Sequence, residues 1–245
     1  MVSSQISAIN LLFPPHCPLC DGELATTDSV GPSLCDECRR ALRSDNRARC
    51  ERCASPLPPL WGVVAECPRC RGRQYRFDRA LALGAYRDDW REAVLKMKRR
   101  VHEPLVRSVG RLLGEAVDER WPRASFRWVV PVPMHWGRRF SRGMHTAAIL
   151  AEYVAQTIGV PVNSRLLCNR RKTRKQGTLT PSDRLRNVRG AFRVSAGYDI
   201  TDAHLLLVDD IMTTGATVSE SARQLKRARA ASVTIAVVAR GTGNA

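Results

Sequence analysis

Two adjacent carboxylates stand at the end of an apolar run near the C-terminus, and a glycine-containing turn follows them. The stretch 205–217 reads LLLVDDIMTTGAT. The residues in it that could bind a ligand are Asp209, Asp210, Thr213, Thr214, Gly215, Ala216 and Thr217. Gly215 permits a positive φ and a close approach of the backbone to a ligand, and the threonine hydroxyls can donate hydrogen bonds. A turn of this kind at a helix N-terminus binds anions, whereas paired carboxylates accept hydrogen bonds from vicinal hydroxyls. A sugar phosphate carries both groups, so the stretch predicts a site for one.

The helix after this turn is expected to begin near Thr217, because Thr217 and Glu220 have the spacing of a capping box. The stretch is not a Walker A loop, because it lacks the Gly-Lys-Ser/Thr ending. An ordinary strand-to-helix turn is the alternative interpretation. The two aspartates and the preceding strand favour the ligand site.

Eight of the nine cysteines form four CxxC pairs within 54 residues. The candidate metal ligands are Cys17, Cys20, Cys35, Cys38, Cys50, Cys53, Cys67 and Cys70. Each pair can turn both sulfurs toward one point, and two pairs complete a tetrahedron of thiolates around Zn²⁺. The spacing therefore predicts two structural zinc ions, with no open coordination position left for catalysis.

Sequential pairing of the four knuckles is preferred, and an interleaved pairing stays open. A disulfide framework is the competing interpretation, and it fits poorly with a reducing compartment. Cys168 stands alone, which indicates a small buried apolar residue. His16, beside Cys17, is expected to be a bystander rather than a ligand.

Apolar segments alternate with amphipathic ones from about residue 78 onward. Strands are expected at 80–86, 127–133, 204–210 and 233–239, and helices at 88–100, 103–121, 143–159 and 216–230. This alternation predicts an α/β fold, a parallel sheet with helices on both faces. Ligands of such sheets bind outside the carboxyl ends of the strands. The aspartates and the segment PMHWGRR, which follows 127–133, should meet at that edge.

The net charge is +17, and it is unevenly distributed. Residues 1–75 are nearly neutral, residues 76–245 carry a net charge of +16, and the basic excess is densest in 165–193. This pattern suits a phosphate-bearing partner, either a nucleic acid or a polyphosphate, with a solvated basic face as the alternative. Aromatic residues make up only 6%, which leaves few stacking platforms for single-stranded DNA. No apolar run is long enough to span a bilayer and no signal peptide is recognised, so a cytoplasmic protein is predicted.

The stretch LLLVDDIMTTGATVSES resembles the phosphoribosyl-pyrophosphate (PRPP) loop of type I phosphoribosyltransferases. Nearly the whole chain is similar to the ComF competence-protein family. The matching residues are LLFPPHCPLC (11–20), the paired cysteines, FDRALALGAY (77–86), VVPVPMH (129–135), Thr173, Gln176, Leu179, Arg184, Asn187, GAF (190–192) and ASVTIAVVAR (231–240). The resemblance implies a double zinc-ribbon module at 1–75 and a type I phosphoribosyltransferase-like domain at 76–245, with a role in natural competence or nucleotide metabolism.

The resemblance also implies roles for individual residues. Asp209 and Asp210 would bind the ribose hydroxyls of PRPP, and the 213–217 loop would hold its 5-phosphate. Pyrophosphate would leave from the anomeric carbon with help from Mg²⁺ and basic side chains. The basic candidates are Lys98, which corresponds to the family's LKY lysine, and His135, Arg138 and Arg139 in PMHWGRR. A hood over the site would include Lys172, Arg174 and Gln176.

Simpler interpretations of these cations remain, because Lys98 can be a helix-end cation and Arg138 and Arg139 can be solvated. Two segments also depart from the family pattern. RGMHTA (142–147) stands where the family has RGFNQA, and MKRRV (97–101) where it has LKYGG. Both departures lie on the pyrophosphate and acceptor side, so the residues support PRPP binding more strongly than turnover.

Three functions stay open at this point. The first is a phosphoribosyltransferase that releases pyrophosphate and uses an acceptor the sequence does not name. The second is a non-catalytic protein that binds single-stranded DNA during transformation. The third is a zinc-ribbon scaffold that contacts another protein of the competence machinery.

Overall fold

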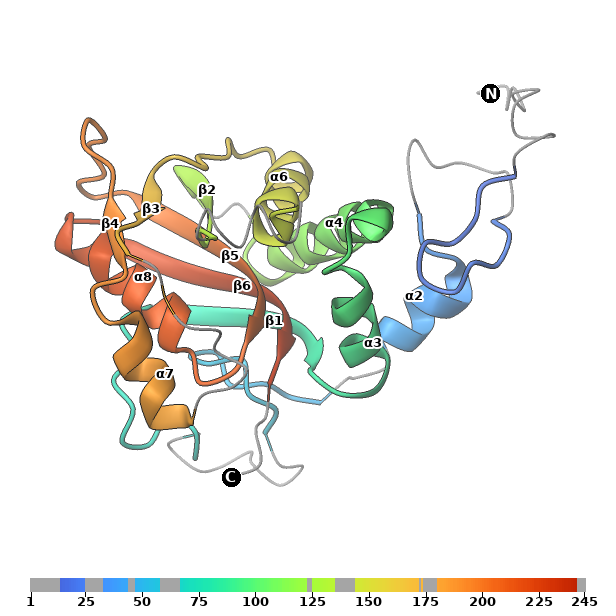
Figure 1. The fold of residues 1–245 in the computed structure, drawn as a ribbon, viewed down its shortest axis with the longest axis horizontal. Coiled ribbons are helices and arrows are strands. Elements are labelled where there is room, and N and C mark those ends of the chain that lie inside the picture. The colour runs from blue at the N-terminus through green and yellow to red at the C-terminus, as the bar shows by residue number, and fades with distance from the viewer. Residues whose placement is uncertain are drawn as a thin grey trace.

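The fold was examined in a computed structural model (Figure 1). It describes residues 14–24, 33–43, 47–57, 67–122, 125–134, 144–171, 173 and 180–241. Within them the strands are β1 (Arg79–Ala85), β2 (Trp128–Pro131), β3 (Leu167–Asn169), β4 (Phe192–Val194), β5 (His204–Met212) and β6 (Ser232–Arg240). The helices are α2 (Asp36–Arg43), α3 (Asp88–Lys96), η1 (Arg100–His102), α4 (Glu103–Arg120), α6 (Thr146–Ile158), α7 (Pro181–Val188) and α8 (Ala216–Arg227). None of these helices combines the length and the apolar character needed to cross a membrane.

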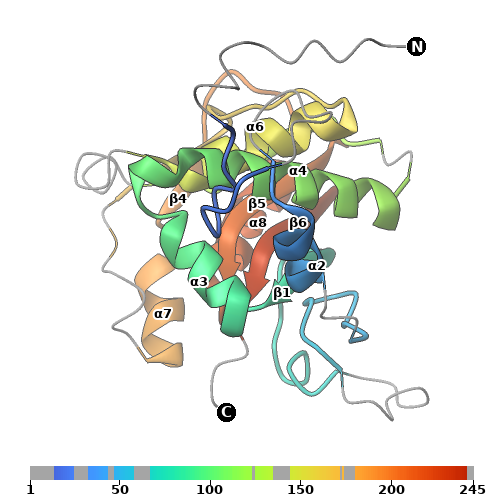
Figure 2. The ribbon, with the colours of Figure 1, turned by 90° about the vertical axis from the view of Figure 1, so that its right-hand side faces the viewer.

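Four parallel strands form the central sheet in the order β1-β6-β5-β2. Successive side chains of a strand lie on opposite faces, so the fully buried run at 205–208 in β5 requires cover on both faces. Leu205 and Leu207 belong to a core that includes α8, whereas Leu206 and Val208 belong to one that includes α3, α4 and α6. Figure 2 shows α3, α4 and α6 in front of the sheet and α8 behind it. The predicted α/β class is confirmed.

The segment between α6 and β5 contains elements that the sequence analysis did not predict. Strands β3 and β4 pair in antiparallel fashion, outside the main sheet, and α7 lies between them in the sequence. Each of these strands has three residues, which is too short for a hydrophobic alternation to be recognised. The pair lies beside α8 (Figure 1).

Strand β5 is two residues longer than predicted and continues through the acidic pair to Met212. On one side β6 accompanies it to the end, with Met212 opposite Arg240. On the other side β2 ends at Pro131, opposite Val208. Asp209 and Asp210 therefore lie beyond the end of one neighbouring strand, where a pocket can form beside them.

The two cysteine-rich segments pack on different parts of the sheet domain. The first ribbon consists of residues 14–24, dark blue in Figure 1, and residues 33–43, which contain α2. It lies against α3, where the Trp90 indole donates to the carbonyl oxygen of Leu42 at 3.0 Å. The second ribbon (residues 47–57 and 67–75) lies along β1, where the Ala80 N–H donates to the carbonyl oxygen of Glu51 at 2.9 Å. Cys53 of the second ribbon is fully buried in the α8-side core, so this ribbon packs against the domain through that knuckle.

Candidate functional site

Two clusters of four cysteines form, each from knuckles that are consecutive in the sequence. They are Cys17, Cys20, Cys35 and Cys38, and Cys50, Cys53, Cys67 and Cys70, with the Sγ atoms of a cluster within 4.8 Å of one another. The Sγ atoms of Cys20 and Cys35 are 3.7 Å apart, and those of Cys53 and Cys67 are 3.8 Å apart. Sulfurs about 2.3 Å from a tetrahedral zinc ion lie about 3.8 Å from each other. Both clusters therefore fit structural zinc, and the sequential pairing is confirmed.

Local hydrogen bonds prepare one thiol of each cluster for a metal. Burial alone would raise the pKa of Cys17, but hydrogen bonds with the backbone of Cys35, Cys20 and Leu19 lower it to about 7. Burial acts in the same direction on Cys53, where hydrogen bonds with the hydroxyl and amide of Ser55 bring the pKa to about 7. The thiolate is the form that binds zinc, so these contacts favour metal binding.

His16 and Cys168, which the sequence set apart from the paired cysteines, lie outside both clusters. His16 Nδ1 is 2.7 Å from the carbonyl oxygen of Asp21, and its ring does not reach the sulfurs of the first cluster. Cys168 is half-buried on β3, with its Sγ 3.6 Å from the carbonyl oxygen of Arg193. The prediction of a buried Cys168 was wrong, because β3 lies outside the main sheet and leaves this side chain half-buried.

Asp209 and Asp210 each use one carboxylate oxygen to accept the next backbone N–H. The Asp210 N–H donates to Asp209 Oδ1 at 2.9 Å, and the Ile211 N–H donates to Asp210 Oδ1 at 2.8 Å. The pKa of Asp209 is raised well above its usual value, first because the carboxyl is desolvated and second because the Asp210 charge lies beside it. A hydroxyl donor or a cation entering the pocket would relieve both effects.

Lys98 lies in the turn after α3, close to this acidic pair. Its Nζ is 3.9 Å from Asp210 Oδ2, with the two side chains 29% and 22% exposed. The lysine also acts to lower the pKa of Asp209, against the larger effects of burial and Asp210. Helix α3 ends before Lys98. Lys98 directly follows the C-cap Met97 and its N–H donates to the Leu95 carbonyl oxygen at 3.3 Å, so the helix-end role stays open and the role in the site stays a prediction.

The 213–217 loop joins β5 to α8 and turns at Gly215, whose φ is +78°. A Cβ at this position would lie 2.8 Å from Cε1 of Tyr75, so glycine is required both for the backbone conformation and for space. Helix α8 begins directly afterwards at Ala216, and the positive end of its dipole faces the loop. Thr214 serves the turn itself, because its hydroxyl accepts the Ala216 N–H at 3.3 Å.

One pocket of about 480 Å³ collects these groups. Its walls include Lys98, Asp209, Asp210, Thr213, Gly215, Ala216 and Thr217. Arg184 of α7 also lines it and donates from Nη1 to Thr213 Oγ1 at 3.1 Å. The sequence analysis cited Arg184 for the resemblance only and gave it no place in the site. It lies in a segment dense in basic residues, and only the position of α7 distinguishes it from its neighbours.

His145 and Thr146, two of the residues that depart from the family pattern, also line this pocket. The His145 Nε2 lies 3.0 Å from the carbonyl oxygen of Val132, which can only accept, so Nε2 donates the proton. The Thr146 hydroxyl donates to the carbonyl oxygen of Met97 at 3.4 Å. Both side chains therefore join the end of β2 and the turn after α3 to the start of α6.

Several predicted residues lie outside the described part of the chain. They are His135, Arg138 and Arg139 of the pyrophosphate segment and Lys172, Arg174 and Gln176 of the hood. Their roles stay predictions. On the described side, β2 does deliver Pro133 and Met134 to the pocket, as the strand order requires.

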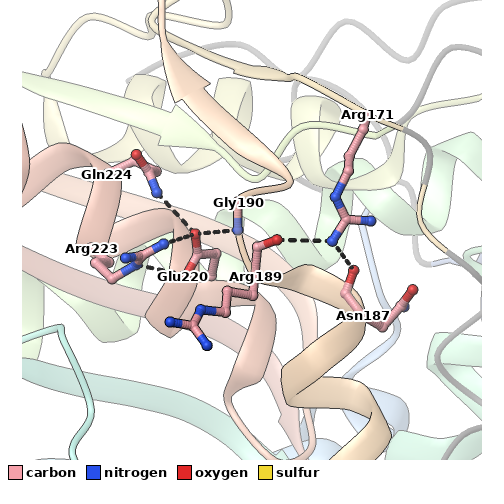
Figure 3. A network of polar contacts seen from close by, with 7 residues as sticks. All are labelled: Arg171, Asn187, Arg189, Gly190, Glu220, Arg223 and Gln224. Carbon is pink, nitrogen blue, oxygen red and sulfur yellow. Dashed lines mark hydrogen bonds and ion pairs between the residues drawn. The ribbon is translucent and has the colours of Figure 1, made fainter.

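Glu220 does not form the predicted capping box, because Gly215 is the N-cap and makes no side-chain capping bond. Figure 3 shows where the carboxylate goes instead: its Oε1 accepts the Gly190 N–H at 2.9 Å, and Arg223 and Gln224 donate to the same group. On the other side of this turn, Arg171 Nη2 donates to the carbonyl oxygens of Asn187 at 3.0 Å and Arg189 at 2.8 Å. The turn after α7 is thereby tied to α8.

Two family profiles match the chain. Residues 8–72 match the double zinc ribbon domain, and residues 142–244 match the phosphoribosyl transferase domain. The first covers both cysteine clusters, and the second covers the acidic pair and the 213–217 loop. The chain therefore combines a double zinc ribbon with a phosphoribosyltransferase domain.

Curated relatives extend over nearly the full length. The DNA utilization protein YhgH of Salmonella typhimurium is 28% identical over 230 residues, which cover 92% of this chain and 96% of that protein. Competence protein F of Haemophilus influenzae is 24% identical, covering 88% of this chain and 92% of that protein. Competence protein ComFC of Bacillus subtilis is 25% identical, covering 89% and 91%. With the two domain matches, these relatives support placing the chain in the ComF family.

Solved structures align with just over half of the chain. The hypoxanthine-guanine phosphoribosyltransferase of L. donovani shares 18% identity over 55% of this chain and 71% of that chain, with a TM-score of 0.36. The PRPP amidotransferase of B. subtilis shares 18% identity over 53% of this chain and 26% of that chain, also with a TM-score of 0.36. The fold class rests on the family profile and on the parallel sheet.

Proposed function

We propose that the pocket binds PRPP together with Mg²⁺. The observation that carries the proposal is that a carboxylate pair, an anion-binding turn and a lysine line one pocket. A ligand for this pocket needs a phosphate for the 213–217 loop and a vicinal diol for Asp209 and Asp210. PRPP has both, and its pyrophosphate would then extend toward Lys98. Arg184 adds a positive charge beside Thr213, on the 5-phosphate side.

We further propose that the protein transfers the phosphoribosyl group to an acceptor that is not yet identified. The bond from the anomeric carbon to pyrophosphate would break while a nucleophile forms a bond on the opposite face. Lys98 would stabilise the charge on the departing oxygens, joined by the predicted donors His135, Arg138 and Arg139. Mg²⁺, when bound with PRPP, would neutralise part of the pyrophosphate charge, and carboxylate oxygens such as those of Asp209 and Asp210 are donors that suit it. The predicted hood would exclude water.

Calorimetry with PRPP and Mg²⁺ tests the binding proposal. The wild-type protein is expected to show saturable heat, and Asp209→Ala combined with Asp210→Ala to lose at least about 2 kcal/mol of binding free energy, roughly thirtyfold in Kd, since charged hydrogen bonds to the ligand disappear. Asp118→Asn, on the exposed end of α4, is the matched control and should bind like wild type. Absence of heat at millimolar PRPP, or unchanged binding by the double variant, would contradict the proposal.

A second candidate function is the handling of single-stranded DNA, with or without a partner from the competence machinery. Two observations favour it. The relatives are named for DNA utilization and competence, and residues 76–245 carry a net charge of +16. Contacts of Lys and Arg with backbone phosphates are independent of sequence, so such a charge suits non-specific binding. Both candidate functions fit the cytoplasmic location that the sequence predicts.

A further inference from the structure

The second ribbon lies directly behind the 213–217 loop, and one buried arginine connects the two. Arg240, the last residue of β6, is fully buried. Its Nε donates to the carbonyl oxygen of Cys53 at 2.9 Å, and its Nη1 donates to that of Met212 at 2.7 Å and also to that of Thr213. A single guanidinium thus bonds the backbone of a metal-ligand residue and the backbone at the start of the loop.

These bonds help to fix which way the loop amides point, together with the Gly241 N–H, which donates to the Met212 carbonyl oxygen at 2.9 Å. In a planar trans peptide the C=O and the N–H point in opposite directions. Because the carbonyls of Met212 and Thr213 are turned toward Arg240, the N–H groups of Thr213 and Thr214 are turned away from it. Arg240 is not among the residues that line the pocket, whereas Thr213 is. The guanidinium therefore orients loop N–H donors away from the ribbon, as an anion site requires.

Tyr75 of the second ribbon makes a separate contact with the same loop. Its ring stacks on Phe77 at a centroid distance of 4.9 Å, and its Cε1 would lie 2.8 Å from any Cβ placed on Gly215. Arg52, between two cysteines of the second cluster, donates from Nη2 to the Tyr75 carbonyl oxygen at 3.2 Å. The ring therefore supports the loop backbone from behind, and the ribbon holds the ring.

The position of the Cys53 carbonyl depends on the knuckle that contains it. Short metal-binding modules have little core of their own and take their geometry from the metal. The first ribbon provides a contrast, because its side-chain polar contacts with the sheet domain are made to α3 and α4. Lys96 Nζ donates to the Leu19 carbonyl oxygen at 2.7 Å, and Arg43 pairs with Glu115 at 2.7 Å. Within the described residues, the loop is contacted by the second ribbon and not by the first.

We propose that the second ribbon is a positioning element of the phosphate-binding loop, and that Arg240 is the positioning residue that connects them. Metal in the cluster of Cys50, Cys53, Cys67 and Cys70 fixes the Cys53 carbonyl, Arg240 transfers that position to Met212 and Thr213, and the loop presents its amides. The inference rests on the proposed PRPP site. It predicts that affinity for the 5-phosphate depends on metal in the second zinc site and does not depend on metal in the first.

Native-state hydrogen exchange, measured without ligand and alongside zinc content, tests this at the two hydrogen-bonded amides of the loop region. They are the Ala216 N–H, which donates to Thr214 Oγ1, and the Gly241 N–H, which donates to the Met212 carbonyl oxygen, and their exchange is called loop exchange below. Arg240→Met removes the donors while keeping length, and loop exchange is expected to rise about 10- to 100-fold, because hydrogen bonds to a charged group are lost. Amides in the middle of β5 should change less than the loop. Arg240→Lys keeps the positive charge but lacks the planar guanidinium with its several N–H donors, so it should recover part of the protection.

Two cysteine variants separate the ribbons. Cys50→Ser with Cys70→Ser is expected to lose one zinc and to raise loop exchange as Arg240→Met does, whereas Cys17→Ser with Cys20→Ser should lose one zinc and leave the loop unchanged. If Arg240→Met does not fold, Tyr75→Ala is the substitute, with Tyr75→Phe as its control. Among the residues that the structure describes, the buried Tyr75 hydroxyl has no hydrogen-bond partner, so its removal should be neutral.

Loop exchange that is unchanged in Arg240→Met, or that rises equally in the first-ribbon variant, would overturn the proposal. PRPP affinity provides the second readout, and it should fall in step with loop protection. A wild-type protein that does not bind PRPP would remove the proposed function. The exchange data would still decide whether Arg240 positions the loop.

Discussion

Asp209 is a carboxyl whose surroundings disfavour its charge in the absence of ligand. Desolvation and the adjacent Asp210 raise its pKa, while Lys98 opposes them only in part. Binding sites often retain groups that lower the stability of the free protein, because those groups gain their partners only when the ligand arrives. The acidic pair therefore has a cost that can be measured without any ligand.

The first prediction at this scale is that Asp209→Asn stabilises the free protein at neutral pH. A raised folded pKa means that stability falls as pH rises from the unfolded value, about 4, through the folded value, and then levels off. Asp209→Asn cannot lose stability in this way, so its Tm should exceed that of wild type increasingly as the pH rises above about 4. Each 1 kcal/mol of regained unfolding free energy should raise Tm by about 2–4 °C. Thermal melts from pH 3.5 to 8 provide the measurement.

The exposed Asp118→Asn serves as the control and should leave the melting profile unchanged. PRPP binding by Asp209→Asn should weaken although the protein is more stable. A Tm at or below that of wild type at neutral pH would contradict the assignment of a raised pKa.

At the scale of elements, the segment from β3 to β4 is held against α8 by a polar network rather than by the main sheet. Glu220, 8% exposed, accepts the Gly190 N–H, and the neighbouring turn is bonded by Arg171 (Figure 3). Helix α7, which brings Arg184 to Thr213, directly precedes this turn. The network therefore keeps a pocket wall in place.

Glu220→Gln is expected to destabilise the protein by about 1–3 kcal/mol, because buried charge-assisted hydrogen bonds are lost. Burial would raise the pKa of Glu220, but hydrogen bonds from Arg223, the Gly190 amide and Gln224 lower it overall. Its contribution is therefore present above the unfolded pKa of about 4.3 and is lost as pH falls through the folded value.

Urea unfolding at pH 7 and at low pH measures the difference in unfolding free energy between wild type and Glu220→Gln. This difference should become smaller at low pH. The exposed Glu119→Gln on α4 is the matched control and should unfold like wild type at both pH values. Equal loss of stability by both variants would contradict a specific role for the network.

At the scale of the whole molecule, the charge distribution predicts polyanion binding separate from the PRPP pocket. Arg52, Arg76 and Arg227 line a hollow between the second ribbon and α8. We expect a labelled single-stranded oligonucleotide to bind with an affinity that falls about 100-fold between 50 and 200 mM salt if about five phosphates are contacted. Fluorescence anisotropy measures this, and Arg227→Glu should weaken binding.

The Asp209→Ala, Asp210→Ala variant is the control for this experiment, because it removes PRPP binding and should leave DNA binding intact. Affinity that is independent of salt, or the absence of binding at 50 mM salt, would remove the second candidate function.

Much of the fold followed from local pattern. The strands within 80–86, 204–210 and 233–239 were recognisable as continuous apolar runs, and the C-cap at Gly159, with φ +68°, followed from its place after a periodic segment. Local pattern did not reveal strands β3 and β4, because a strand of three residues is too short to show a period. It did not reveal the end of β5 either, because charged residues rarely continue a buried strand.

The sequence by itself determined the eight metal-ligand cysteines and the chemistry of the 209–217 stretch, because each CxxC pair and the turn are continuous in the chain. The structure decided how the four pairs combine into two clusters. Only the tertiary structure decided what surrounds them. Arg184, Tyr75 and Arg240 come from separate elements, and each reaches the loop because the sheet and its helices bring distant segments together. A local sequence pattern depends only on a residue and its neighbours in the chain. The contacts of Arg184, Tyr75 and Arg240 with the loop depend on packing across the whole domain.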